Sequence, residues 1–215
     1  AMSSKIEDGR SRVVIENVRP EVDGGRFAIK RTVGEQVQVE ADVFADGHDV
    51  IRCLLLHRAE TGRAWRGVAM QAIGNDRWRG SFTVDKLGRH VYTVMAWIDQ
   101  FFTWRHDLAR RNDAADTAST PEDGKRVGGD AELGELMARH GERRFPTTYA
   151  KVLAVTVEPE RARYSTWYEL FPRSCSDDGR HGRFKDCERR LPYIAAMGFD
   201  VLYMPPIHPI GTMFR

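Results

Sequence analysis

The sequence predicts a mixed fold with three successive parts: an N-terminal immunoglobulin-like β-sandwich over residues 11–108, a linker region with a short helix over residues 109–160, and a β-α-β unit over residues 161–215. Three patterns support this division. The first part consists of short apolar runs separated by Gly, Asn and Asp turns. The second is polar and rich in small residues before one amphipathic segment. The third has an apolar run, a helical repeat and a second apolar run.

The clearest strand of the sandwich lies at residues 37–43, where Val and Ala alternate with Gln, Glu and Asp. A period of two places the apolar set on one face of the strand, which we expect to face the core. Further strands are expected at residues 51–57, 67–73, 77–84 and 90–98, with Gly-containing turns between them. About seven strands in this span is the size of an immunoglobulin-like sandwich.

Four of the tryptophans fall in this first part, and they allow two interpretations. They are Trp65, Trp78, Trp97 and Trp104. Large aromatic side chains in a small sandwich are usually core or interface residues. Solvent-facing tryptophans, in contrast, can stack on sugar rings. The sequence leaves both interpretations open.

The middle of the chain is predicted to be a polar linker at residues 109–129, because it almost lacks large apolar side chains. Asp130 is a good N-cap for a helix at residues 131–140, and Gly141 is a suitable stop. A further extended segment is expected at residues 152–157.

The last part predicts a strand at residues 163–171, a helix from Phe184 to about Gly198 and a strand at residues 200–204. Pro192 is expected to kink or break this helix. Two strands joined by a helix make a β-α-β unit with parallel strands. A lone unit of this kind cannot bury both faces of its strands. We therefore expect that Arg215 is not the end of a natural domain and that the chain is part of a longer protein.

Composition excludes several classes of partner. Hydrophobic residues make up 41% of the 215 residues and charged residues 30%, which is enough apolar surface for a core. The 33 basic and 31 acidic residues give a formal charge of only +2 at pH 7, so neither nucleic acid nor a membrane surface is an expected partner. No apolar stretch is long enough to predict a membrane span.

The positions of the cysteines and the lack of nucleotide and zinc motifs predict a cytoplasmic protein with no cofactor and no metal. Cys53, Cys175 and Cys187 lie far apart and form no CxxC or Cys/His ligand cluster, which fits a reducing cytoplasm. The sequence has no GxGxxG, GxxxxGK[ST] or HExxH motif. Motif support for a nucleotide or zinc enzyme is therefore lacking.

Two long segments of the chain carry a family resemblance. ARYSTWYELFPRS from Ala162 to Ser174 and HGRFKDCERRLPYIAAMGFDVLYMPPIHPIG from His181 to Gly211 resemble the start of the catalytic barrel in bacterial alpha-1,4-glucan:maltose-1-phosphate maltosyltransferases, which belong to the α-amylase superfamily. The β-rich first part, with Thr103–Asp107, is also similar to the amino-terminal sandwich of that family. The resemblance implies that residues 161–215 are the first β-α-β of a (β/α)8 barrel that is truncated here. The family usually has a longer helical insertion than the polar stretch before Asp130.

The resemblance also implies an activity. Enzymes of this family are glycosyltransferases of α-glucan (glycogen) biosynthesis that move maltosyl units from α-maltose 1-phosphate to the non-reducing end of an α-1,4-glucan, with retention and release of phosphate. A homodimer formed through the N-terminal region is implied as well. The retaining mechanism uses a nucleophilic Asp, an acid/base Glu and a further orienting Asp, all on later barrel strands beyond Arg215. We therefore expect no catalytic residue in this chain and no activity of the chain alone.

Two residues are candidates for substrate binding. Glu169 lies near the end of the first predicted barrel strand, where functional groups gather in such barrels. Its alternative role is a structural hydrogen bond or ion pair at the barrel mouth. His208 follows the second strand and could line a sugar site, although Pro206 and Pro209 on either side also suit a loop-shaping role.

Two other functions remain open at this point. The protein could be another α-amylase-superfamily glycoside hydrolase or branching enzyme, since the same layout supports several reactions. The chain could also act as a non-catalytic glucan-binding or dimerisation module.

Overall fold

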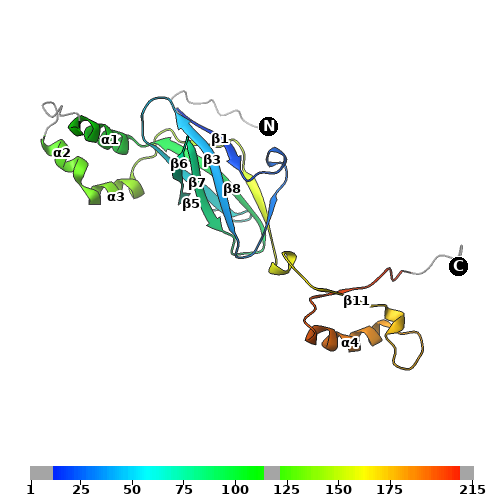
Figure 1. Cartoon of the computed structure of the whole chain (residues 1–215). Coiled ribbons are helices and arrows are strands. Elements are labelled where there is room, and N and C mark those ends of the chain that lie inside the picture. Colours follow the sequence, from blue (N-terminus) through cyan, green and yellow to red (C-terminus); the bar gives the residue numbers. More distant parts are fainter. Residues whose placement is uncertain (1–11, 114–121, 209–215) are drawn as a thin grey trace. The chain divides into compact units, whose positions relative to one another are not determined.

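The computed structural model describes residues 12–113 and 122–208, and it divides the chain into two compact units, one up to Val157 and one from Glu158. In Figure 1 the chain runs from the sandwich into three helices, returns to the sandwich at residues 147–158 and then enters the second unit. The end of the PPIHPIG motif, residues 209–211, and the expectation about Arg215 lie outside the described residues. No described helix has both the length and the apolar character needed to cross a membrane.

One sheet of the first unit has four strands in the order β1-β3-β7-β6, each antiparallel to its neighbour. They are β1 (Val13–Arg19), β3 (Gln36–Ala45), β7 (Arg77–Thr83) and β6 (Gln71–Gly74). In β3, Val37, Val39, Ala41 and Val43 are buried and alternate with more exposed polar residues. The alternation predicted for residues 37–43 is confirmed.

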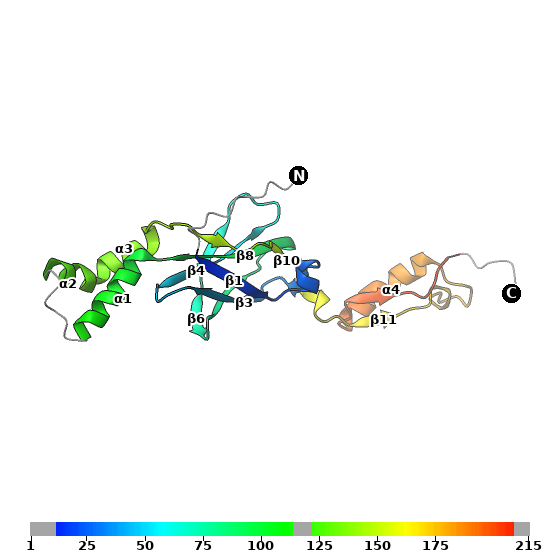
Figure 2. The same cartoon turned by 90° about the horizontal axis from the view of Figure 1, so that it is seen from above.

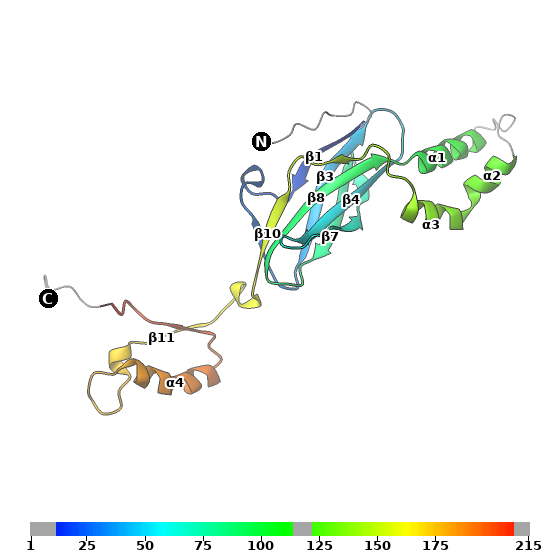
Figure 3. The same cartoon turned by 180° about the vertical axis from the view of Figure 1, so that it is seen from behind.

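The second sheet has six strands, in the order β2-β10-β8-β4-β5 with β9 paired to β8. They are β2 (Ile29–Thr32), β10 (Leu153–Glu158), β8 (Gly88–Ile98), β4 (Ile51–Ala59), β5 (Arg66–Ala69) and β9 (Thr147–Thr148). A short 3-10 helix, Asp23–Gly25, precedes β2. Buried residues of both sheets form one hydrophobic core that includes Val39, Leu55, Tyr92 and Val155. Figure 3 shows the strands from behind. This architecture agrees with the predicted β-sandwich.

The single strand expected at residues 67–73 is divided between the two sheets. β5 belongs to the six-stranded sheet and β6 to the four-stranded sheet. The chain changes sheets at Met70, which is buried and lies 3.3 Å from Cys53 through its sulfur atom. Because the Met70 side chain lies in the core at this point, the segment forms two short strands instead of one long strand.

A strand from beyond the helices completes the sandwich. β10 pairs antiparallel with β8, from Leu153 opposite Tyr92 to Val157 opposite Gly88, and it lies between β2 and β8. The extended segment expected at residues 152–157 is therefore a strand of the sandwich core. The sandwich is not formed by a continuous stretch of chain ending at Leu108.

Three helices lie at one end of the sandwich in Figure 2: α1 (Gln100–Asp113), α2 (Glu122–Gly129) and α3 (Ala131–His140). The prediction of α3 is confirmed, and Asp130 accepts a hydrogen bond from the Leu133 amide at 3.0 Å, as an N-cap should.

The expectation of an irregular linker at residues 109–129 is wrong for the described part, because α1 and α2 occupy most of it. Residues 100–108, included in the predicted sandwich, also belong to α1. Leu108 is buried, and a Cβ atom added to Gly128 would lie 2.4 Å from its side chain, so α1 and α2 pack closely here. Leu108 of α1 therefore packs directly on Gly128 of α2, where a larger residue would not fit without a shift.

The second unit contains β11 (Trp167–Glu169), α4 (Phe184–Ala196) and β12 (Val201–Tyr203), with 3-10 helices at Glu160–Ala162 and Pro172–Ser174. β11 and β12 are parallel, so the predicted β-α-β unit is confirmed, although both strands are shorter than expected. α4 continues through Pro192, where we expected a kink or a break. Leu170, Cys175, Cys187 and Ile194 form a small core of their own.

Candidate functional site

The carboxyl ends of β11 and β12 lie at the same edge of their two-stranded sheet. The parallel register places Glu169 opposite Tyr203, and the Leu170 amide donates to the Tyr203 carbonyl at 3.0 Å. The ring centroids of Trp167 and Tyr203 are 6.4 Å apart. In parallel barrels, the edge at the carboxyl ends of the strands carries the active site.

The opposite edge of this sheet is held by Asp200 and Thr166. One carboxylate oxygen of Asp200 accepts hydrogen bonds from the Thr166 amide at 3.1 Å and from its hydroxyl at 3.2 Å, and the other lies 3.3 Å from the Arg161 guanidinium. The backbone hydrogen bond from Thr166, helped by its hydroxyl and by Arg161, holds the pKa of Asp200 below its usual value. These contacts align the first residues of both strands and so set the register of their ends.

Alternation along β11 separates its side chains into two faces. Tyr168 packs with Phe199, at 5.1 Å between ring centroids, within the small core that α4 contributes to. Trp167 and Glu169 therefore lie on the face away from that core, and Tyr203 shares this face through its pairing with Glu169. The three side chains are exposed in this unit.

The two predicted site residues are not brought together by any contact among the described residues. Glu169 lies at the end of β11, as the sequence predicted, and its side chain is exposed. His208 is exposed in the irregular segment that follows β12. Their roles remain predictions.

Trp167 and Tyr203 were not among the sequence candidates. Their position beside Glu169 could have been inferred from the sequence, because strand alternation and a parallel register together put both residues on the same face as Glu169. The register itself, however, depends on Asp200 and Thr166, which are 34 positions apart in the chain.

The structure also answers part of the question about the tryptophans in the sandwich. Trp97 is buried beneath Arg143, and Trp78 packs against the core while its indole N–H donates to the Val43 carbonyl at 3.1 Å. Trp65 and Trp104 are exposed by 38% and 41%. Two of the four are therefore core residues, and the other two reach solvent at different places, Trp65 beneath Arg58 and Trp104 on α1.

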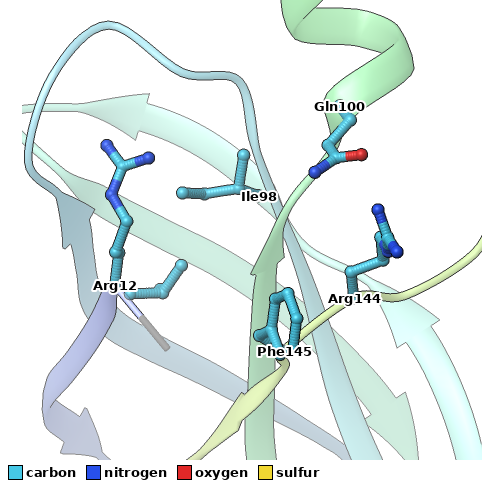
Figure 4. Close-up of a pocket in the computed structure, with 6 residues that line it drawn as sticks. Arg12, Ile98, Gln100, Arg144 and Phe145 are labelled. Atoms are coloured by element: carbon cyan, nitrogen blue, oxygen red, sulfur yellow. The ribbon is translucent and has the colours of Figure 1, made fainter. Parts of the chain in front are cut away.

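A cavity of about 280 Å³ lies where the sandwich meets the helices, between Arg12, Ile98, Gln100, Arg144 and Phe145. Figure 4 shows Arg12 on one side of it and Arg144 with Gln100 on the other. Arg12 is paired with Asp46 at 2.8 Å and Asp49 at 2.9 Å, which compensates its charge. The cavity offers no strong chemical group for catalysis.

No group of three or more His, Cys, Asp or Glu side chains suited to holding a metal ion occurs within residues 12–113 and 122–208. The three cysteines are buried and unpaired. Sulfur atoms of Cys175 and Cys187 approach to 3.7 Å in the small core of the second unit.

Comparison with known proteins gives consistent matches. Residues 11–129 match the family model described as alpha-1,4-glucan:maltose-1-phosphate maltosyltransferase, domain N/S. The enzyme with that name from Chlorobaculum tepidum is 43% identical over 97% of this chain and 36% of its own length. The one from Myxococcus xanthus is 41% identical over 94% of this chain and 37% of its own length. The chain thus spans little more than a third of these relatives. The resemblance of the chain to this family is confirmed, whereas the start of a barrel at residues 161–215 stays a prediction.

Proposed function

Since this chain belongs to the alpha-1,4-glucan:maltose-1-phosphate maltosyltransferase family, we propose that it is the N-terminal part of an enzyme that transfers maltosyl units from α-maltose 1-phosphate to the non-reducing end of an α-1,4-glucan. Phosphate leaves and the anomeric configuration is retained. The observation that carries this proposal is the parallel pair β11 and β12, which the two most specific sequence motifs form. Its location is proposed to be the cytoplasm, which three unpaired cysteines support.

In this proposal residues 161–215 are the first β-α-β unit of a (β/α)8 barrel, preceded by an immunoglobulin-like sandwich and the helical region. Barrel helices cover the outside of the strands, and the inward side chains fill the interior. α4 packs on the Tyr168 side of β11, so Trp167, Glu169 and Tyr203 would face the barrel interior or its rim. Their exposure in the present unit is what an uncovered interior face requires.

The chemistry follows the double displacement of retaining enzymes. A carboxylate attacks the anomeric carbon while the phosphate leaves, and the acceptor hydroxyl of the glucan then displaces the carboxylate from that carbon. The family resemblance puts the three carboxylates concerned on later barrel strands. Glu169 and His208 are therefore proposed to contact substrate at the rim, without forming or breaking the glycosidic bond.

The activity is tested with the longer protein, maltose 1-phosphate and glycogen. We expect release of inorganic phosphate that depends on both substrates and matches the lengthening of glucan chains. Hydrolysis or branching of glycogen without maltose 1-phosphate would favour another enzyme of the superfamily. The 215-residue chain alone should release no phosphate above background, and turnover by it would overturn the proposed position of the carboxylates.

The rim role of Glu169 has its own test in the longer protein. Glu169→Gln should raise KM for maltose 1-phosphate, or lower kcat, by about tenfold, which is a change of roughly 1.4 kcal/mol. Glu188→Gln is the matched control because Glu188 is exposed on α4, away from the strand ends. Equal kinetics of both variants and the unchanged enzyme would exclude contact of Glu169 with substrate.

We also propose a homodimer formed through the N-terminal region. Exposed apolar side chains on each of the three helices support it: Trp104 by 41%, Val127 by 37% and Leu136 by 50%. Sedimentation equilibrium of the 215-residue chain should show a dimer at micromolar concentration. A monomer mass across this range would contradict the proposal.

A further inference from the structure

A second, chemically distinct cavity lies at the end of the sandwich where two hairpin turns meet. It has a volume of about 310 Å³ and is here named the basic pocket. Side chains from β4 and β5, from the turn between them, from the segment after β7 and from β8 surround it. The titratable ones are His57, Arg58, Arg63, Arg66, Asp85, Lys86 and His90.

The basic pocket concentrates positive charge. It is lined by three arginines and one lysine but by only one carboxylate, Asp85, whereas the whole chain has a formal charge of only +2. Most arginines elsewhere on the sandwich have acidic partners, such as Arg77 with Asp42 and Arg79 with Glu40, each at 2.8 Å. Among the described residues, no carboxylate forms an ion pair with Arg63, Arg66 or Lys86. These three side chains are exposed and can turn toward an anion.

Two of the lining residues hold the turns in place. Arg58 donates to the carbonyl oxygens of Ala59, Glu60 and Gly62, and its guanidinium lies 4.7 Å from the Trp65 ring. These contacts fix the turn between β4 and β5. The buried His90 ring is 2.9 Å from the Lys86 carbonyl oxygen and fixes the turn before β8. Less ordering of the backbone is then needed when a ligand binds.

His57 forms the floor between the sheets. Its ring stacks on Phe82 of β7 at 4.3 Å, and its backbone pairs with Arg66 of β5. Burial, followed by the charges of Arg66 and His90, lowers the pKa of His57, and Asp85 opposes this effect. The half-buried imidazole therefore lies in a positive field that a bound anion would reduce.

We propose that the basic pocket binds a small phosphate-bearing anion, either inorganic phosphate or a phosphate monoester. Arginine forks match the oxygen geometry of a phosphate group, and lysine adds a point charge. The volume is at the lower end of the range of about 300–1,000 Å³ for small-molecule sites. The positive charge is local to this pocket, which favours a small anion over a long polyanion.

The test is a titration of the 215-residue chain followed by ¹H–¹⁵N NMR at constant ionic strength. The two phosphate ligands are inorganic phosphate and glucose 1-phosphate, and the comparison ligands are maltose and sodium sulfate. We expect saturable shifts at Arg63, Arg66 and Lys86, and a higher pKa of His57 in the bound state, with both phosphate ligands. Tighter binding of glucose 1-phosphate would identify a monoester, and equal binding would identify the phosphate group alone. Both results support the pocket.

A pair of variants separates the pocket from general charge attraction. Arg63→Gln with Arg66→Gln should weaken phosphate binding at least tenfold. The control, Arg26→Gln with Arg79→Gln, removes the same charge from two arginines that have acidic partners and should change affinity less than twofold. Equal losses in both pairs, equally strong binding of sulfate, or absence of saturable shifts in the unchanged chain would overturn the proposal.

Discussion

Leu55 is completely buried in β4 and lies between the two sheets, since a Cβ atom added to Gly80 of β7 would come within 3.5 Å of it. Leu55→Ala should lower the free energy of unfolding by about 2–5 kcal/mol, because it leaves a cavity in the core. Leu87, with 59% of its side chain exposed, provides the matched control. Leu87→Ala should change stability by less than about 0.5 kcal/mol. Urea unfolding followed by tryptophan fluorescence measures both, and similar values would contradict the assigned core.

Cys53 should make stability depend on alkaline pH. Burial raises the pKa of its thiol from 9.0 to about 12, so the folded thiol stays protonated where the unfolded one ionises. The stabilising contribution is complete below pH 9.0 and is lost as the pH rises from there toward about 12. Between about pH 8 and about pH 10.5 the free energy of unfolding should fall by roughly 2 kcal/mol from this group.

Cys53→Ala provides the comparison for this prediction. The variant loses packing at every pH, but it has no thiol to titrate at this position. The stability of the variant should therefore fall less steeply above pH 9.0. Burial also raises the pKa of Tyr92, and some alkaline loss should therefore remain in the variant. Parallel stability curves for the two proteins would show that the thiol of Cys53 is accessible to water.

At the scale of elements, α3 depends on its N-cap. The Asp130 carboxylate satisfies the Leu133 amide, which otherwise lacks a partner in the first turn. Asp130→Ala should destabilise the helix by about 0.5–2 kcal/mol, whereas Asp130→Ser should retain most of the cap. Amide exchange within α3 measures the difference. Equal exchange rates in both variants would mean that packing against α1 alone holds this helix.

Across the whole molecule, stability should differ strongly between strands. β3 has a hydrogen-bonded neighbour on both sides, as does β8, whereas β12 has only β11. Hydrogen exchange should therefore be slow at residues 37–43 and 92–98 and fast at residues 200–204. Strong protection of residues 200–204 in a proven monomer would show that the second unit has a complete core, and the barrel proposal would fall.

The sequence predicted those features that depend on a short repeat of apolar residues or on the type of a single residue. The alternation of β3, the cap at Asp130 and the helical spacing of α4 each follow from neighbours at most a few positions apart. The position of Glu169 at the end of a strand could be predicted for the same reason. The helical structure of α1 and α2 could not be predicted, because Leu108 and Gly128 come into contact only after the chain has folded back.

The sequence by itself determined most strands of the sandwich, the helices α3 and α4, the parallel β-α-β unit and the family motifs at residues 162–211. Only the tertiary structure decided that β10 enters the sandwich between β2 and β8, that Tyr203 shares a face with Glu169, and that Arg63 and Lys86 line one pocket. The physical reason is the range of the interactions. Periodicity and capping act within one or two turns of chain, whereas strand order and the meeting of distant turns depend on which long-range pairing buries the most apolar surface.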